Sequence, residues 1–232
     1  MFLAMDTVFD QCSIAILNAK GQVLSNHTET GNRQQTQQIL PMIDAALSEA
    51  NLRLADIQAL VFNRGPGAFS GIRINTAVVQ ALSVAHDIPC VGISSLQAIA
   101  QCAYQKYGLT HVYSALDARM QQVYFGQYAI TDESADNPIM QPVVLNDSDS
   151  TEQLLDYDSL TLLDIAVVGN GARLLQLHDG QVCYEEVHPD AAVIGQLGIA
   201  QFNTCGGTDA ANALPKYVRN QAWKTLKEQG KA

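Results

Sequence analysis

The sequence has few basic and few aromatic residues. Its 232 residues include 13 Lys and Arg against 23 Asp and Glu, giving a net charge of −10, and Phe, Trp and Tyr make up only 6%. A charge of this sign argues against a large nucleic-acid-binding face. Residues 128–215 contain fourteen acids and one base, whereas residues 216–232 contain five bases and one acid. The sequence leaves open whether this basic tail is a solvated chain end or contacts a phosphate-bearing or acidic partner.

Cysteine pairs with disulfide or metal-ligand spacing are missing. The five cysteines are far apart, stand among apolar residues and include no C-x-x-C pair. This pattern indicates reduced thiols in a cytoplasmic protein. The first ten residues, MFLAMDTVFD, lack a basic start and a long apolar run, so we expect neither a signal peptide nor a membrane span.

Motifs of the common enzyme classes are missing as well. The sequence has no G-x-S-x-G elbow, and its five histidines form no H-x-x-x-H or H-E-x-x-H pair for a metal ion. Asp6 and Asp117, each at the end of an expected strand, are weak candidates for a metal site, because polar turns after strands are common. The sequence therefore predicts the scaffold of a site without catalytic equipment.

Hydrophobic periodicity predicts an α/β fold for the first half of the chain. A hairpin turn joins the second and third strands, and Pro41 is expected to interrupt the first helix. Ser94 or Ser95 caps the last helix. The expected strands span residues 2–5, 12–17, 22–28, 57–62 and 90–93, and the expected helices span 34–50, 70–85 and 95–107.

The second half begins again with strands. The expected elements are strands over 112–116, 122–130 and 165–168, a loop or meander over 131–150, a short helix over 151–156, and a helix over 191–202 closed by Gly206 and Gly207. Both halves open with strands that end in an acid. This similarity suggests two related α/β lobes, residues 1–107 and the smaller, acidic 108–232, joined near residue 108.

The stretch RGPGAFSGIR at residues 64–73 contains three glycines and two arginines. It lacks the lysine of a P-loop, and its glycines are spaced one residue too widely for G-x-G-x-x-G. Two interpretations remain: a tight turn in which Ser70 caps the following helix, or an anion site at the start of that helix. The candidate phosphate or nucleotide contacts are Asp6, Thr7, Arg64, Gly65, Gly67 and Ser70.

The two helices that flank this loop carry more apolar or small residues than one core-facing stripe requires. Helix 34–50 has a wide apolar face, and helix 70–86 is rich in small residues that let another helix come close. Either the lobe covers both helices itself, or a second protein packs on them. The candidate partner-interface residues are Thr36, Leu40, Ile43, Leu47, Arg73, Ala77 and Gln80.

Four stretches resemble the TsaB (YeaZ) family: RGPGAFSGIR, QTQQILPMI at 35–43, SALDARMQQVYFGQY at 114–128 and PKYVRNQAWK at 215–224. The resemblance spans nearly the whole chain. It implies the actin-like ATPase (ASKHA) fold, with two lobes that each have a βββαβα core. It also implies work with TsaD, TsaE and a threonylcarbamoyl-AMP synthase, which place threonylcarbamoyladenosine (t6A) in tRNA next to the anticodon.

The resemblance further implies a pseudo-enzyme, because TsaB proteins are similar to TsaD but catalytically inert and pair with it through first-lobe helices. We expect a cytoplasmic subunit that binds and activates a TsaD-type subunit together with a TsaE-type ATPase, forms a homodimer alone, and meets tRNA only indirectly. No cofactor is expected on the chain by itself; ATP or ADP is expected, if anywhere, at the interface with the partner. The alternatives are a stand-alone ATP-binding enzyme or peptidase-like hydrolase, and a direct tRNA binder acting through the basic tail.

The sequence departs from the family pattern at a few positions. Gln35 stands where TsaB proteins commonly have His, which puts a role for that imidazole in doubt. Ala68 and Ser70 stand where Ser and Thr are usual, and residue 70 keeps a hydroxyl. The first turn, residues 6–10, lacks the glycine of active superfamily members, and the His-x-x-x-His pair with which TsaD holds its metal ion is absent. These departures agree with a subunit that lacks catalytic residues of its own.

Overall fold

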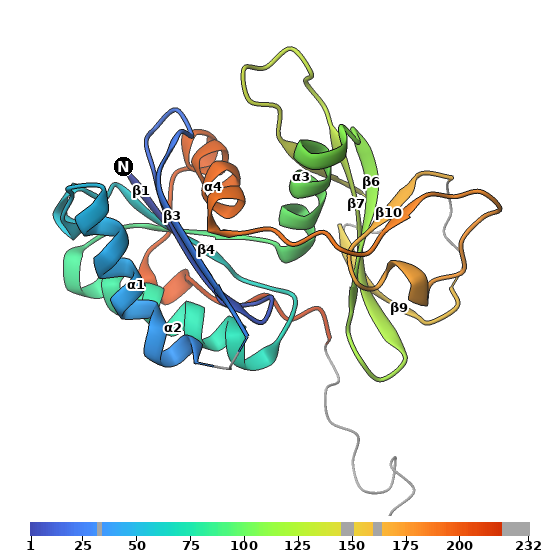
Figure 1. Cartoon of the computed structure of the whole chain (residues 1–232), viewed down its shortest axis with the longest axis horizontal. Helices are drawn as coiled ribbons and strands as arrows, with labels where there is room; N and C mark the ends of the chain where they lie inside the picture. The colour runs from blue at the N-terminus through green and yellow to red at the C-terminus, as the bar shows by residue number, and fades with distance from the viewer. Residues whose placement is uncertain (32–33, 145–150, 160–163, 220–232) are drawn as a thin grey trace, which may run out of the picture.

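The computed structural model describes residues 1–31, 34–144, 151–159 and 164–219 and shows two lobes, each built on one sheet (Figure 1). The first sheet has the order β3-β2-β1-β4-β5, with β1 antiparallel to β2 and parallel to β4. Its strands are β1 (Phe2–Asp6), β2 (Gln11–Leu17), β3 (Val23–Thr30), β4 (Ala59–Asn63) and β5 (Cys90–Ile93). The predicted order of elements in this half is confirmed.

Both faces of the first sheet are covered by helices. Every residue of β1, β2 and β4 is buried, and successive side chains point to opposite faces. Leu3 and Met5 pack with residues of α1 (Gln35–Glu49) on one face, where α2 (Phe69–His86) also lies. Phe2 and Ala4 pack with residues of α4 (Ala191–Cys205) on the other face. Pro41 does not interrupt α1, contrary to the prediction. Proline has no N–H to donate to the Gln37 carbonyl, but both residues face solvent, where water can replace the missing donor.

The second sheet has the order β11-β10-β6-β7-β8, and β9 also pairs with β7. Its strands are β6 (His111–Asp117), β7 (Gln122–Ile130), β8 (Met140–Val143), β9 (Glu152–Asp156), β10 (Ala166–Val168) and β11 (Cys183–Tyr184). The prediction of a helix over 151–156 is wrong, because residues 152–156 pair antiparallel with β7. Pairing satisfies more of their backbone N–H and C=O groups than a single helical turn would. Within the predicted loop 131–150, β8 forms, and residues 145–150 lie outside the described part of the chain.

Two helices near the junction pack on the lobe that lies across the boundary predicted at residue 108. Helix α3 (Ser95–Tyr107) packs on the second sheet through Leu96 and Ile99, whereas α4, from the second half, packs on the first sheet (Figure 1). A glycine allows α4 to lie close to the first sheet, because a Cβ added at Gly198 would lie only 2.1 Å from Cγ1 of Val61. The lobes are therefore separate sheets, but each is covered partly by a helix from the other half.

Candidate functional site

Asp6 ends β1 and is completely buried. Its carboxylate accepts hydrogen bonds from the Val8 N–H at 2.8 Å, Asn63 Nδ2 at 3.1 Å and Gln11 Nε2 at 3.2 Å. Burial raises the pKa of Asp6 from 3.8 to about 7, although these three donors act in the opposite direction. Both carboxylate oxygens thus have partners inside the protein, and Asp6 organises the turn between β1 and β2.

The loop at residues 64–73 closes over this turn. The Thr7 hydroxyl donates to Gly71 O at 2.7 Å, and a Cβ on Gly71 would lie only 2.1 Å from Thr7 O. A Cβ on Gly67 would lie 2.3 Å from Cγ1 of Val8, and Gly65 has a φ of +94°, where glycine is favoured. These contacts support the interpretation of the stretch as a tight strand-to-helix turn.

The prediction that Ser70 caps the following helix is wrong. Helix α2 starts one residue earlier, the capping position is Ala68, and no side chain caps the helix. Ser70 lies exposed in the first turn. The next predicted cap is confirmed: Ser94 accepts a hydrogen bond from the Leu96 N–H at the start of α3.

The six candidate phosphate contacts have different surroundings. Asp6, Thr7 and Gly65 are buried, Ser70 is exposed, and Arg64 and Gly67 are half-buried. Because the Thr7 proton is already donated and Asp6 is fully hydrogen-bonded, neither presents a free donor to a phosphate. Contact with a phosphate therefore stays a prediction, and Arg64 is the one cation among the six candidates.

Two buried asparagines organise this region and were missed in the sequence. Asn63 ends β4 and accepts hydrogen bonds from the Gly65 N–H at 2.9 Å and from Ser95 Oγ at 2.7 Å. Asn75, on α2, donates to the carbonyls of Met5 and Asn63. Asn63 could have been found from the sequence, because a polar residue at the end of an otherwise apolar strand indicates a buried amide, and a buried amide requires hydrogen-bond partners.

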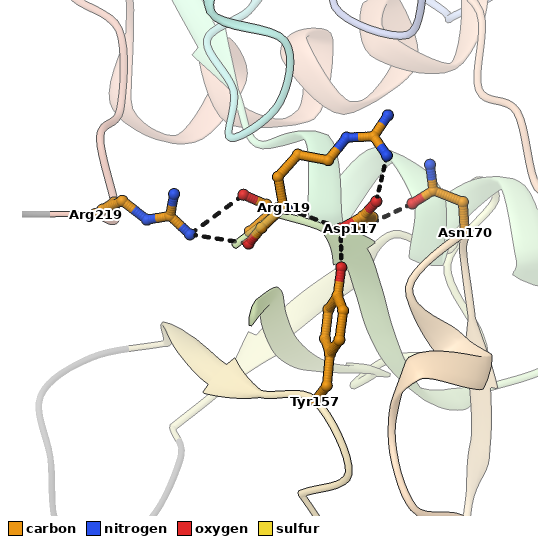
Figure 2. Close-up of polar contacts among 6 residues, drawn as sticks. Asp117, Arg119, Tyr157, Asn170 and Arg219 are labelled. Atoms are coloured by element: carbon orange, nitrogen blue, oxygen red, sulfur yellow. Dashed lines mark hydrogen bonds and ion pairs between the residues drawn. The ribbon is translucent and has the colours of Figure 1, made fainter. Parts of the chain in front are cut away.

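A second polar cluster lies at the end of β6 (Figure 2). Asp117 accepts hydrogen bonds from Tyr157 Oη at 2.7 Å and from the Arg119 N–H at 2.7 Å, and its backbone N–H donates to Asn170. The Arg119 guanidinium also forms an ion pair with Asp117 at 2.9 Å. The hydrogen bond to Asp117 raises the pKa of Tyr157. This cluster holds the turn that contains the DARM residues of the family resemblance.

Three consecutive residues of that turn have left-handed backbone conformations. The φ angles of Arg119, Met120 and Gln121 are +59°, +54° and +60°. Residues other than glycine rarely adopt this conformation, and runs of them are found where the surroundings impose it. Arg219 contributes by donating from Nη2 to the carbonyls of Ala118 and Arg119 (Figure 2). The side chains of Arg119 and Met120 are thereby presented to solvent.

A third cluster joins the lobes around Glu152 of β9. Its carboxylate is buried and accepts hydrogen bonds from Ser94 Oγ and, at 2.7 Å, from Tyr128 Oη. Lys216 Nζ lies 3.0 Å from Glu152 Oε2, and the Lys216 backbone N–H donates to Arg64 O. Burial, with Glu152 beside it, raises the pKa of Tyr128 well above its ordinary value of 10. Sequence patterns did not single out Glu152, because its partners lie in distant segments.

The candidate partner-interface residues do not share one environment. Thr36, Leu40, Arg73 and Ala77 are exposed, and Leu40 keeps 56% of its surface accessible. Ile43 and Leu47 belong instead to the core below α1, so the prediction that they meet a partner is corrected by their burial against the sheet. Gln80 is half-buried and donates to the carbonyls of Ala210 and Ala213. The exposed residues lie on neighbouring helices α1 and α2.

The described residues contain no group of three or more His, Cys, Asp or Glu side chains that could hold a metal ion. In the same part of the chain, no helix is both long and apolar enough to cross a membrane. A cavity of about 300 Å³ lies away from Asp6, between the β2–β3 turn, α3 and α4. Its lining includes the side chains of Gln101, Tyr104 and Gln196.

Family and structural relatives match almost the whole chain. The model of the TsaD family, described as tRNA N6-adenosine threonylcarbamoyltransferase, matches residues 22–225. The tRNA threonylcarbamoyladenosine biosynthesis protein TsaB of Escherichia coli is 32% identical, with 97% of each chain covered. The TsaB of Haemophilus influenzae is 31% identical, with 97% of this chain and 96% of the relative covered.

Solved structures agree with these sequence relatives. YeaZ from Pseudomonas aeruginosa superposes with a TM-score of 0.79 at 30% identity, covering 93% of this chain and 98% of that chain. A Pseudomonas aeruginosa protein described as similar to the peptidase YeaZ has a TM-score of 0.81 at 30% identity, covering 94% and 99%. The matches confirm the predicted two-lobed, actin-like α/β fold.

Proposed function

The chain belongs to the TsaB (YeaZ) family and has its role in t6A biosynthesis, and we propose that it acts there as a non-catalytic subunit. In this role it binds and activates a TsaD-type catalytic subunit, together with a TsaE-type ATPase. Modification of tRNA is then carried out by the partner, and this chain contributes a binding surface. ATP or ADP, where bound, would lie at the interface with the partner.

The observation that carries this proposal is the exposed face of α2 and its neighbour α1. Ala77 is exposed on α2, and Val84 keeps 77% of its surface accessible. Leu40 is exposed on α1. Large apolar side chains beside small ones allow a second helix pair to approach closely, which is typical of a protein interface.

The surroundings of the acids support a non-catalytic role. Asp6 is buried with both oxygens hydrogen-bonded, and Asp117 is held by Tyr157 and Arg119. A metal-dependent or hydrolytic centre requires groups that face a substrate. In the described residues, the clusters around these acids instead stabilise turns.

Two substitutions on the exposed face test the proposal. Leu40→Asp and Ala77→Arg should each weaken binding to the TsaD-type subunit, measured by sedimentation, and lower tRNA modification in a reconstituted assay. Ala55→Arg is the matched control, because Ala55 is exposed in a separate short helix, Leu54–Asp56. Full modification activity with both face variants would overturn the interface.

A nucleotide titration separates this role from a stand-alone enzyme. The proposal expects no tight ATP or ADP binding by the isolated chain, and binding only when the TsaD-type subunit is present. Tight binding by the isolated chain, with hydrolysis that Thr7→Ala or Asp6→Asn abolishes, would support the enzyme alternative instead.

A further inference from the structure

The basic residues of this acidic protein gather at one place. The described part of the chain contains nine Lys and Arg side chains. Five of them are linked by contacts at the junction of the two lobes, and we call these five the cationic junction. The cationic junction consists of Arg64, Arg73, Arg119, Lys216 and Arg219.

The segment that follows the short helix Ala210–Asn212 connects these residues. The Lys216 N–H donates to Arg64 O at 2.9 Å, which attaches the segment to the carboxyl end of β4 in the first lobe. Arg73 Nε donates to Tyr217 Oη at 3.3 Å. Arg219 Nη2 donates to Arg119 O at 3.3 Å, in the second lobe. The contacts therefore form one continuous chain across the junction.

Aromatic side chains stand among these cations. The Arg73 guanidinium carbon lies 3.8 Å from the centre of the Phe69 ring, and the Tyr217 ring centre lies 6.4 Å from that of Phe69. Phe69 and Tyr217 keep 57% and 50% of their surfaces exposed. Arginine planes and aromatic faces are the surfaces on which unstacked bases of RNA stack.

The two acids that form ion pairs with the cationic junction point into the protein. Glu152 is buried and engaged by Ser94, Tyr128 and Lys216. Asp117 keeps only 16% of its side chain exposed and accepts from Tyr157, whereas its ion-pair partner Arg119 keeps 86% exposed. Lys216 and Arg119 are thus more exposed than the acids they pair with, and the nearest exposed acid linked to the cationic junction is Asp156, which Gln122 connects to Arg219.

We propose that the cationic junction binds the phosphate backbone of an RNA, with Arg73 and Arg119 as outward phosphate contacts and Tyr217 as a stacking surface. The proposal rests on the proposed function, whose substrate class is tRNA, and adds a direct contact where the composition predicted only an indirect one. Phosphate contacts position an RNA without reading its sequence. The ion pair of Lys216 with Glu152 holds Tyr217 and Arg219 in place between the lobes.

The observations favour RNA over an acidic protein as the occupant. This surface combines cations with two exposed aromatic rings, Phe69 on α2 and Tyr217 on the last described segment, on which bases can stack. The junction also lies at the carboxyl ends of β1, β4 and β6, where open α/β sheets bind ligands. An acidic protein as occupant is an outcome of the test.

The test measures binding of the full chain, alone and in complex with its TsaD-type subunit, to an unmodified tRNA transcript by fluorescence anisotropy. Binding should weaken steeply as salt rises from ~50 to ~200 mM. Arg73→Gln/Arg119→Gln should lower the affinity about tenfold or more and reduce the slope of log K against log salt by about 1.5. Arg73→Lys/Arg119→Lys should keep most of the slope, because the charges remain.

The matched control is Lys20→Gln/Arg53→Gln, which removes the same charge. Lys20 follows β2 and Arg53 precedes β4, and both lie at the end of the first sheet where β1 begins. The control should bind the transcript as the unchanged chain does. Equal loss in both double variants, or no RNA binding at ~50 mM salt by chain or complex, would overturn the proposal.

A separate measurement distinguishes this failure from failure of the proposed function. Affinity of each variant for the TsaD-type subunit is determined by sedimentation without RNA. If Arg73→Gln/Arg119→Gln weakens binding to the TsaD-type subunit but leaves RNA binding unchanged, the junction is a protein interface. The RNA proposal would then be wrong, and the proposed function would stand. A stable complex that binds no RNA would likewise overturn the RNA proposal and leave the proposed function standing.

Discussion

Lys216 Nζ lies 3.0 Å from Glu152 Oε2, and this ion pair joins the end of the described chain to a strand of the second lobe. The Glu152 side chain is 3% exposed and the Lys216 side chain 34%. The Lys216 N–H is bonded at the same time to Arg64 in the first lobe. One residue of the last segment thus contacts both lobes.

Removing this lysine should destabilise the protein. Lys216→Met leaves the Glu152 carboxylate buried without its cation, and we expect a loss of roughly 2–3 kcal/mol in the free energy of unfolding, reduced from a fully buried pair because Lys216 is partly solvated. Urea denaturation measures the loss. Lys20→Met, at an exposed turn, should change stability by less than about 0.5 kcal/mol. Similar values for both variants would contradict the prediction.

Asp6 should make stability depend on pH. The folded pKa of about 7 lies above the ordinary value of 3.8, so the folded state binds the extra proton and stability is lost as pH rises between these values. The loss amounts to roughly 4 kcal/mol at most. Asp6→Asn should flatten the fall in stability between pH 4 and pH 7, whatever its absolute stability. An equally steep fall in stability in the Asp6→Asn variant would contradict the prediction.

The two serines at the starts of α2 and α3 should respond differently to truncation. Ser94→Ala removes the helix cap and a hydrogen bond to Glu152, and should reduce the free energy of unfolding by about 1–2 kcal/mol. Ser70→Ala removes no cap and should stay within about 0.5 kcal/mol of the unchanged protein. Thermal unfolding followed by circular dichroism compares the two variants. A larger loss of stability in Ser70→Ala than in Ser94→Ala would contradict this and support Ser70 as the cap of α2.

Gly71 should not tolerate a side chain. In Gly71→Ala the added Cβ would lie 2.1 Å from the carbonyl oxygen of Thr7, and backbone must move to relieve the clash. We expect a loss of at least about 2 kcal/mol, measured by denaturant unfolding. Ala68→Gly in the same loop, at an exposed position with extended backbone, is the comparison and should cost less than about 1 kcal/mol. Equal losses would show that general loosening of the loop is responsible.

The isolated chain should form a homodimer through the exposed face of α1 and α2. Ala77→Arg should shift it to a monomer at micromolar concentration in sedimentation or light scattering, because an arginine enters a face built for close approach. Ala55→Arg should remain a dimer. A monomeric unchanged chain would contradict the expectation.

Local patterns determined most of the first lobe. The short apolar runs in Phe2–Asp6 and Gln11–Leu17 predict the paired strands, and the apolar spacing from Ile39 to Leu47 predicts α1. The stretch at 64–73, together with those at 35–43, 114–128 and 215–224, was sufficient to indicate the family, because these features depend only on neighbouring residues in the chain.

Other features were decided only by tertiary structure. Residues 152–156 are too few to hold a helix alone, so pairing with β7 made them a strand. The direction in which Ile43 and Leu47 face depended on the position of the sheet. Ser70 does not cap α2, because the helix already begins at Phe69.

The distribution of charge shows the same limit. The composition determined a net charge of −10, but only the folded chain brings Arg73, Arg119 and Arg219 together from segments up to 146 residues apart. A sum over residues contains no distances, whereas electrostatic attraction depends on them. Sequence by itself therefore determined the family and the strands and helices of the first lobe, and the tertiary structure decided which side chains meet at the junction of the lobes.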